Sequence, residues 1–139
     1  MTKKRIALSG GFDPIHVGHI RMIKEAANHG DVVIFLNTDN WLERKKGYIF
    51  MPFKERKEIL NSIKFVSEVY AAKDEDNSVC ESLFEHVPDL FGNGGDRKND
   101  NTPEIQTCKK LGIELLWNLG GGKIQSSSDL VGRSKLRND

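Results

Sequence analysis

The sequence predicts an α/β fold: a single Rossmann-like domain with a parallel sheet of about five strands and helices on both faces. Short apolar runs without polar alternation are typical of strands that are covered on both faces. These runs alternate along the chain with segments of helical periodicity, and the connections between them are short. A chain of 139 residues with 37% hydrophobic content suffices for one packed core, so we expect residues 1–139 to form one domain.

The first half of the chain begins this alternation of strands and helices. An apolar run at residues 5–9 ends at a glycine pair and predicts the first strand. Apolar residues recur at helical spacing over residues 18–29, and a wholly apolar core then predicts a second strand over residues 31–38. Residues 39–50 form a polar segment with lysines that is typical of a loop, and Pro52 marks the start of the next helix.

The second half continues with apolar runs for strands and an apolar stripe for each helix. The expected elements, in chain order, are a strand over residues 65–72, a helix over 79–87, a strand over 89–92, a helix over 103–111, a strand over 113–117 and a terminal helix from about Ser127. Such an alternation is typical of an open sheet with right-handed crossovers.

Charge and cysteine content narrow the class of partner. The chain has 21 lysines and arginines against 20 acidic residues, so no basic surplus suggests a nucleic-acid or membrane surface, and a small charged substrate fits better. Cys80 and Cys108 lack the spacing of a redox or metal pair. No apolar stretch resembles a signal peptide or approaches the ~20 residues that span a bilayer. We therefore expect a cytoplasmic protein with free thiols.

The loop after the first strand carries the strongest candidate site. Open α/β sheets bind ligands at the carboxyl ends of their strands, where glycines let the backbone approach a phosphate and a helix N-terminus offers positive potential. His16 and His19 begin the next helix three residues apart, which places both imidazoles on one side to meet a triphosphate, while Gly18 leaves room for a bulky group. The candidate nucleotide-binding residues of this loop are Gly10, Gly11, Phe12, Asp13 and Gly18.

The segment from Gly10 to His19 resembles the G-x-F-D-x-x-H-x-G-H signature of the cytidylyltransferase-like nucleotidyltransferase superfamily. The shorter His-x-Gly-His element also occurs in class I aminoacyl-tRNA synthetases, but this chain is too short for one and lacks their Lys-Met-Ser-Lys-Ser loop. The resemblance is strongest with sugar-phosphate adenylyltransferases of the heptose 1-phosphate type and with glycerol-3-phosphate cytidylyltransferases. It implies transfer of a nucleoside monophosphate from a triphosphate to a phosphorylated small molecule, with His16 and His19 catalytic.

The segment after the second strand resembles the lysine loop of the same superfamily. The resemblance implies a catalytic lysine: Lys46, next to Gly47, matches the adenylyltransferases, whereas Lys45 fits the spacing of the cytidylyltransferases, and both stay candidates. It further implies that Arg56 and Asp39 bind the acceptor, with Arg56 making a two-pronged hydrogen bond to its phosphate.

Two later segments complete the candidate site. Residues 94–98, Gly-Gly-Asp-Arg-Lys, resemble the G-G-D-x-K element of sugar-phosphate adenylyltransferases, which implies that Asp96 contacts nucleotide or acceptor hydroxyls. Ser126, Ser127 and Ser128 stand where the superfamily carries a hydroxyl-rich helix start, and their hydroxyls and backbone N–H groups can hold the β- and γ-phosphates.

The expected reaction is an in-line attack on the α-phosphorus without a covalent intermediate, with Mg²⁺ carried by the triphosphate. The Arg-Thr-Glu-Gly-Ile-Ser-Thr element of the cytidylyltransferases is missing before the last helix, which favours ATP over CTP. The expected partners are a nucleoside triphosphate and a phosphorylated sugar or small alcohol, without nucleic acid or membrane, in a homodimer. The alternatives are a glycerol-3-phosphate-type cytidylyltransferase and a nucleotide-binding module without turnover, although intact His16 and His19 argue against the module.

Overall fold

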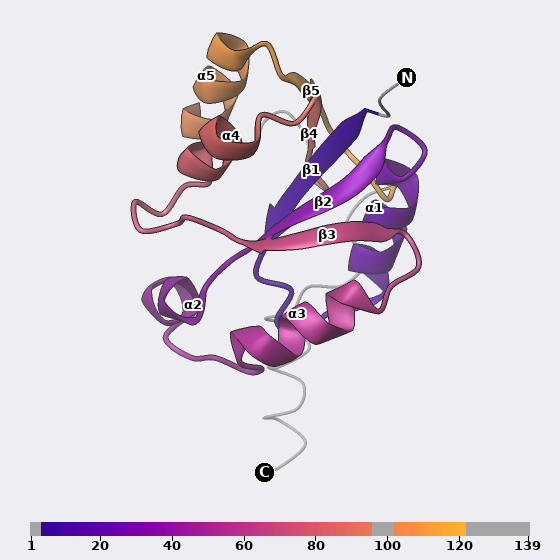
Figure 1. The fold of residues 1–139 in the computed structure, drawn as a ribbon. Helices are drawn as coiled ribbons and strands as arrows, with labels where there is room; N and C mark the ends of the chain where they lie inside the picture. The colour runs from indigo at the N-terminus through magenta and orange to yellow at the C-terminus, as the bar shows by residue number, and fades with distance from the viewer. Residues whose placement is uncertain (1–3, 96–101, 122–139) are drawn as a thin grey trace.

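A computed structural model describes residues 4–95 and 102–121 (Figure 1). Its elements, in chain order, are β1 (Arg5–Gly10), α1 (Val17–Ala26), β2 (Asp31–Leu36), α2 (Asp39–Lys46), α3 (Phe53–Asn61), β3 (Val66–Ala71), α4 (Cys80–His86), β4 (Leu90–Gly92), α5 (Thr102–Leu111) and β5 (Glu114–Leu116). Within this described part of the chain, every helix is too short or too polar to cross a bilayer.

The strands form one five-stranded parallel sheet in the order β3-β2-β1-β4-β5, which confirms the fold class that the sequence predicts. β1 and β2 pair from Arg5 beside Asp31 to Gly10 beside Leu36. The apolar core of β2, Val32 to Leu36, is buried throughout, as expected of a strand covered on both faces.

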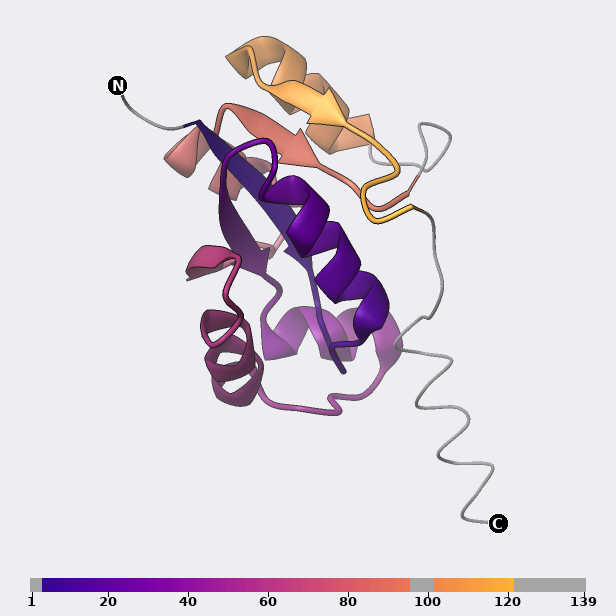
Figure 2. The same cartoon turned by 90° about the vertical axis from the view of Figure 1, so that its right-hand side faces the viewer.

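Helices cover both faces of the sheet (Figures 1 and 2). One hydrophobic layer includes Ile23 of α1 and Leu60 of α3, and the layer on the opposite face includes Leu83 of α4 and Cys108 of α5. These two layers hold the strands in place. The loops that follow the carboxyl ends of the strands therefore start from defined positions along one edge of the sheet.

The strand order reverses between β1 and β4, the position at which open α/β sheets bind ligands. Hydrogen bonds tie the neighbouring strand ends together. The N–H of Asn37, which follows β2, donates to the carbonyl of Gly10 at the end of β1 (2.9 Å). The N–H of Asn93, which follows β4, donates to the carbonyl of Leu116 at the end of β5 (2.9 Å). The loops that follow these strands therefore start from a rigid base.

Helix α2 is the main departure from the sequence prediction, which places a loop over residues 39–50. The Thr38 hydroxyl caps the helix by accepting the N–H of Trp41 (3.2 Å), and Gly47 ends it with a left-handed φ of 81°. The helix buries Leu42 and is otherwise largely polar, so it lacks the apolar periodicity that marks the other helices. The terminal helix expected from about Ser127 lies outside the described residues.

Candidate active site

Two glycines at the end of β1 let the chain pass close to neighbouring side chains. A Cβ atom on Gly10 would lie 3.1 Å from the Phe12 ring, and a Cβ atom on Gly11 would lie 2.9 Å from Leu42 of α2. Phe12, which the sequence suggested as a nucleotide contact, is 3% exposed and packs with its ring centroid 4.6 Å from that of His19. Its side chain therefore supports a catalytic candidate from within the core.

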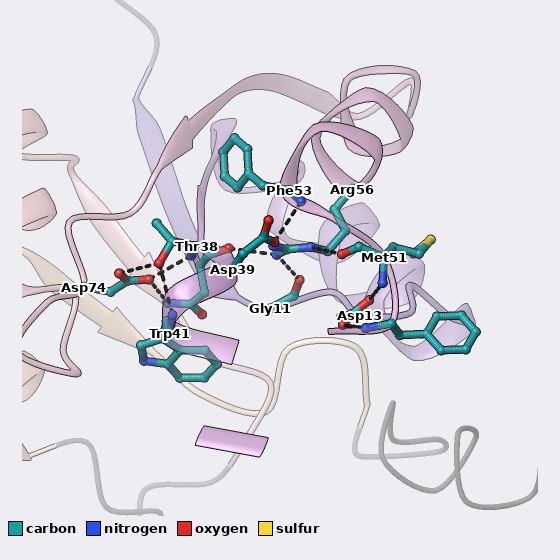
Figure 3. Close-up of polar contacts among 11 residues, drawn as sticks. Gly11, Asp13, Thr38, Asp39, Trp41, Met51, Phe53, Arg56 and Asp74 are labelled. Atoms are coloured by element: carbon teal, nitrogen blue, oxygen red, sulfur yellow. Dashed lines mark hydrogen bonds and ion pairs between the residues drawn. The ribbon is translucent and has the colours of Figure 1, made fainter. Parts of the chain in front are cut away.

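Asp13, which the sequence suggested as a nucleotide contact, is engaged within the protein. Its carboxylate is fully buried and accepts the backbone N–H of Phe50 (2.7 Å) with one oxygen and that of Met51 (2.6 Å) with the other (Figure 3). A buried carboxylate is costly unless such partners satisfy it. Asp13 is thus a positioning residue that joins the loop between β1 and α1 (residues 11–16, the histidine loop) to the segment before α3.

His16 and His19 cap helix α1 reciprocally. Nδ1 of His16 accepts the N–H of Gly18, and Nδ1 of His19 accepts the N–H of His16, both at 3.1 Å. The rings are stacked, with 3.9 Å between their centroids and 23° between their planes. Because each Nδ1 accepts a hydrogen bond, each ring carries its proton on Nε2, the atom that can donate to a ligand.

The surroundings of His19 keep its ring neutral. Burial, then the neighbouring charges of His16 and Lys46, lower the pKa of His19 from 6.5 to about 3. Gly18 adds to this close packing, since a Cβ atom there would lie 2.9 Å from Cε1 of His16. The space that Gly18 was expected to leave for a ligand is therefore occupied by the His16 ring.

The two candidate lysines differ in their surroundings, although both lie in the last turn of α2. Lys46 is partly buried, and its charge is close enough to His19 to lower the pKa of that ring. Lys45 is exposed, and its Nζ lies over the Trp41 ring, 5.9 Å from the ring centroid. Of the two lysines, Lys46 is thus the one whose charge acts on His19.

The guanidinium of Arg56, which the sequence suggested as a ligand for the acceptor phosphate, is buried. Its side chain is 0% exposed and donates hydrogen bonds to the carbonyls of Met51 (2.9 Å), Gly11 (2.9 Å) and Asn37 (2.7 Å) (Figure 3). It also donates to the Asp39 carboxylate (2.7 Å). The ion pair of Arg56 and Asp39 therefore holds three segments of the site together. The atoms through which the two side chains face each other are hydrogen-bonded within the protein.

Asp74, which follows β3, was not singled out from the sequence, yet it fixes the start of α2. Its carboxylate accepts hydrogen bonds from the Asn37 side chain (3.1 Å) and from the backbone N–H and hydroxyl of Thr38 (both 2.9 Å). Arg44 of α2 donates to the Asp74 carbonyl (2.8 Å). These contacts tie the helix that carries Lys46 to the ends of β2 and β3. Position after a strand was the only signal in the sequence that pointed to them.

The loops after β4 and β5 support each other beside helix α1. The Leu119 N–H donates to the Asn93 carbonyl (3.0 Å). Gly120 has a φ of 89°, and a Cβ atom there would lie 2.9 Å from the backbone nitrogen of Met22 in α1, so this close approach requires glycine. The predicted contacts Asp96, Ser126, Ser127 and Ser128 lie outside the described residues.

The arrangement can stabilise negative charge, and the buried Cys108 thiol is no part of it. Imidazole donors, the Lys46 cation and the N-terminus of α1 together suit the phosphates of a nucleotide. Burial raises the pKa of the Cys108 thiol to about 12, which keeps that thiol protonated. Among residues 4–95 and 102–121, no group of three or more His, Cys, Asp or Glu side chains is placed to hold a metal ion.

Comparisons with known proteins agree with this geometry. A family model described as cytidylyltransferase-like matches residues 7–129. An FAD synthase of Thermococcus sibiricus is 34% identical over 119 residues, covering 81% of this chain and 79% of the relative. A glycerol-3-phosphate cytidylyltransferase of Bacillus subtilis is 31% identical over 94 residues, covering 67% and 72%. The solved structure of a lipopolysaccharide core biosynthesis protein from Thermoplasma volcanium is 27% identical with a TM-score of 0.70, covering 84% of this chain and 96% of that one.

Proposed function

This chain belongs to the cytidylyltransferase-like family of nucleotidyltransferases, and from that premise we propose that it transfers AMP from ATP to the phosphate of FMN, forming FAD and pyrophosphate. The observation that carries the catalytic part is the stacked pair of His16 and His19, with Lys46 beside it. Such a group of donors suits a reaction in which charge grows on phosphoryl oxygens.

In the proposed reaction, an oxygen of the acceptor phosphate attacks the α-phosphorus of the triphosphate in line with the bond to the β-phosphate. The new phosphorus–oxygen bond forms as the old one breaks, and pyrophosphate carries away the electron pair. The Nε2–H groups of His16 and His19 donate to the oxygens on which charge builds, and Lys46 neutralises part of that charge. Catalysis comes from positioning and charge stabilisation, so no residue forms a covalent intermediate.

Mg²⁺ is proposed to arrive bound to the triphosphate, whose oxygens are the hard ligands that it prefers. The histidine loop offers it no open carboxylate, since both oxygens of Asp13 accept backbone N–H groups. Bound with the triphosphate, the ion would neutralise charge on the leaving group.

The preference for ATP and FMN is supported by the relatives named FAD synthase. FAD is FMN joined to AMP, so an enzyme that makes FAD from FMN needs an adenylyl donor. The Gly94-Gly95-Asp96-Arg97-Lys98 segment, which resembles an adenylyltransferase element, favours the same donor. The proposed acceptor is thus a phosphorylated polyol that carries a flavin, whereas the sequence predicts a phosphorylated sugar or small alcohol.

A second candidate is CTP with glycerol 3-phosphate, because the Bacillus subtilis relative covers two thirds of the chain at similar identity. Against it stands the absence of the Arg-Thr-Glu-Gly-Ile-Ser-Thr element before the last helix. A site that hydrogen-bonds one base edge rejects the wrong base because buried polar groups lose their partners.

The test is a matrix of ATP, CTP, GTP and UTP against FMN, glycerol 3-phosphate and heptose 1-phosphate, read by pyrophosphate release and by the mass of the product. We expect ATP with FMN to give the highest kcat/KM. A tenfold preference for CTP with glycerol 3-phosphate would refute the proposed substrates but leave nucleotidyl transfer intact. Pyrophosphate release in no combination would favour a binding module without turnover.

A further inference from the structure

The segment between α2 and α3 lies across the histidine loop and is fixed to it. Asp13 of that loop accepts the backbone N–H groups of Phe50 and Met51 at 2.7 and 2.6 Å. Arg56 holds the same segment from the other side, since its Nε donates to the Met51 carbonyl and its Nη1 to the Gly11 carbonyl, both at 2.9 Å. The backbone of Phe50 is therefore placed rigidly with respect to His16 and His19.

The Phe50 side chain, in contrast, is 52% exposed although its backbone is anchored on a buried carboxylate. A single exposed apolar residue needs no explanation, but two further apolar side chains, from α1 and α2, are also exposed or partly exposed next to the histidine loop. Val17, which stands between His16 and Gly18, is 45% exposed. The Trp41 ring is partly exposed and lies 3.8 Å from the point where a Cβ atom on Gly11 would be.

These three apolar residues each adjoin the loop that leads to the histidine pair. Val17 follows His16, the Trp41 ring lies next to Gly11, and the Phe50 backbone is bonded to Asp13. Figure 3 shows Trp41 and Met51, the residue after Phe50, on opposite sides of Gly11. Phosphate groups gain nothing from apolar neighbours, whereas the uncharged part of a substrate can cover them and remove their surface from water. A glycerol or heptose backbone has no flat apolar face to do so, but the ring system of a flavin has one.

We propose that Phe50 is a specificity-determining residue for the acceptor, and that its ring stacks on a planar aromatic group of that acceptor. The inference rests on the proposed function, which it deepens by assigning recognition of the flavin ring to the segment between α2 and α3. Aromatic side chains pair with flat ring systems in offset or edge-to-face geometry. Because Asp13 and Arg56 hold this segment, its backbone needs little reordering when the acceptor binds.

The experiment compares Phe50→Ala and Phe50→Tyr with the wild-type enzyme, and uses Phe84→Ala as the matched control. Phe84 is 48% exposed on α4, which covers the other face of the sheet. We expect Phe50→Ala to raise the KM for FMN and the Kd for FMN without ATP, measured by flavin fluorescence, by about tenfold. Phe50→Tyr should restore both values to within about twofold because it keeps the ring, and Phe84→Ala should change neither.

The outcomes separate this inference from the proposed function. A wild-type enzyme that uses glycerol 3-phosphate but not FMN refutes the proposed acceptor itself. If FMN is a substrate and its KM and Kd are the same in Phe50→Ala as in the wild type, the assignment of Phe50 is wrong while the proposed function stands. A rise in the KM for ATP with an unchanged KM for FMN would place the ring at the nucleotide base and also overturn the assignment. Unchanged thermal unfolding of Phe50→Ala ensures that each result reports on binding.

Discussion

The imidazole of His16 stacks on that of His19 at 3.9 Å between centroids, and each ring accepts a backbone N–H through Nδ1. The same contacts therefore cap helix α1 and orient the two imidazole rings of the site. The hydrogen bonds at Nδ1 fix the tautomer, so both Nε2–H groups have a fixed orientation before substrate binds.

The histidines can be tested with variants that keep the cap. A glutamine side chain at position 19 can accept the backbone N–H of residue 16, as in an ordinary capping box. Asparagine at position 16 is a preferred N-cap residue. We expect His19→Gln and His16→Asn each to lower kcat by about 10²-fold while thermal unfolding stays close to that of the wild type, because only the imidazole donor is lost. Steady-state kinetics and calorimetry measure the two quantities. Turnover near the wild-type level in a well-folded variant contradicts the catalytic role.

The pKa of His19 predicts how stability depends on pH. The pKa is about 3 in the folded protein against 6.5 for an ordinary histidine, so the unfolded chain binds a proton at this position first as the pH falls. The free energy of unfolding should therefore decrease between pH 6.5 and 3, with at most ~1.4 kcal/mol lost per pH unit from this residue. Urea unfolding at pH 7, 6 and 5 measures the slope. It should be shallower in His19→Gln, and an equal slope in both proteins would contradict the neutral state of His19.

Much of this site can be predicted from the sequence, because it depends on residues that are close together along the chain. The unalternated run in β2 predicts a buried parallel strand, and three-residue spacing predicts that His16 and His19 lie on one side of a helix start. The role of Arg56 could not be predicted, since its partners Gly11 and Asn37 lie 45 and 19 residues away along the chain. The anchoring of α2 by Asp74 depends in the same way on contacts 36 and 37 residues apart. Sequence identifies a charged side chain but not what surrounds it.

The two lysines of α2 should differ in their effect on the site. Lys46 acts on the pKa of His19, whereas Lys45 lies over Trp41, so we expect Lys46→Met to lower kcat by about 10²-fold and Lys45→Met by less than about threefold. Removal of the Lys46 charge should also raise the pKa of His19, which NMR titration of the imidazole Cε1–H resonance measures without substrate. Equal kinetic effects of both substitutions would show that the lysines act together as a diffuse charge.

Arg56 offers a test that separates a structural role from direct binding of the acceptor. Its buried guanidinium joins the Gly11, Asn37 and Met51 carbonyls to Asp39, and lysine cannot reproduce this planar fork. We expect Arg56→Lys to lower the free energy of unfolding by ~2–4 kcal/mol, because buried acceptors lose their donors. Urea unfolding measures the change, with Lys57→Gln on the exposed part of α3 as the control that leaves stability within ~0.5 kcal/mol. If Arg56→Lys instead unfolds like the wild type and raises only the KM for the acceptor, the guanidinium binds substrate as the sequence suggested.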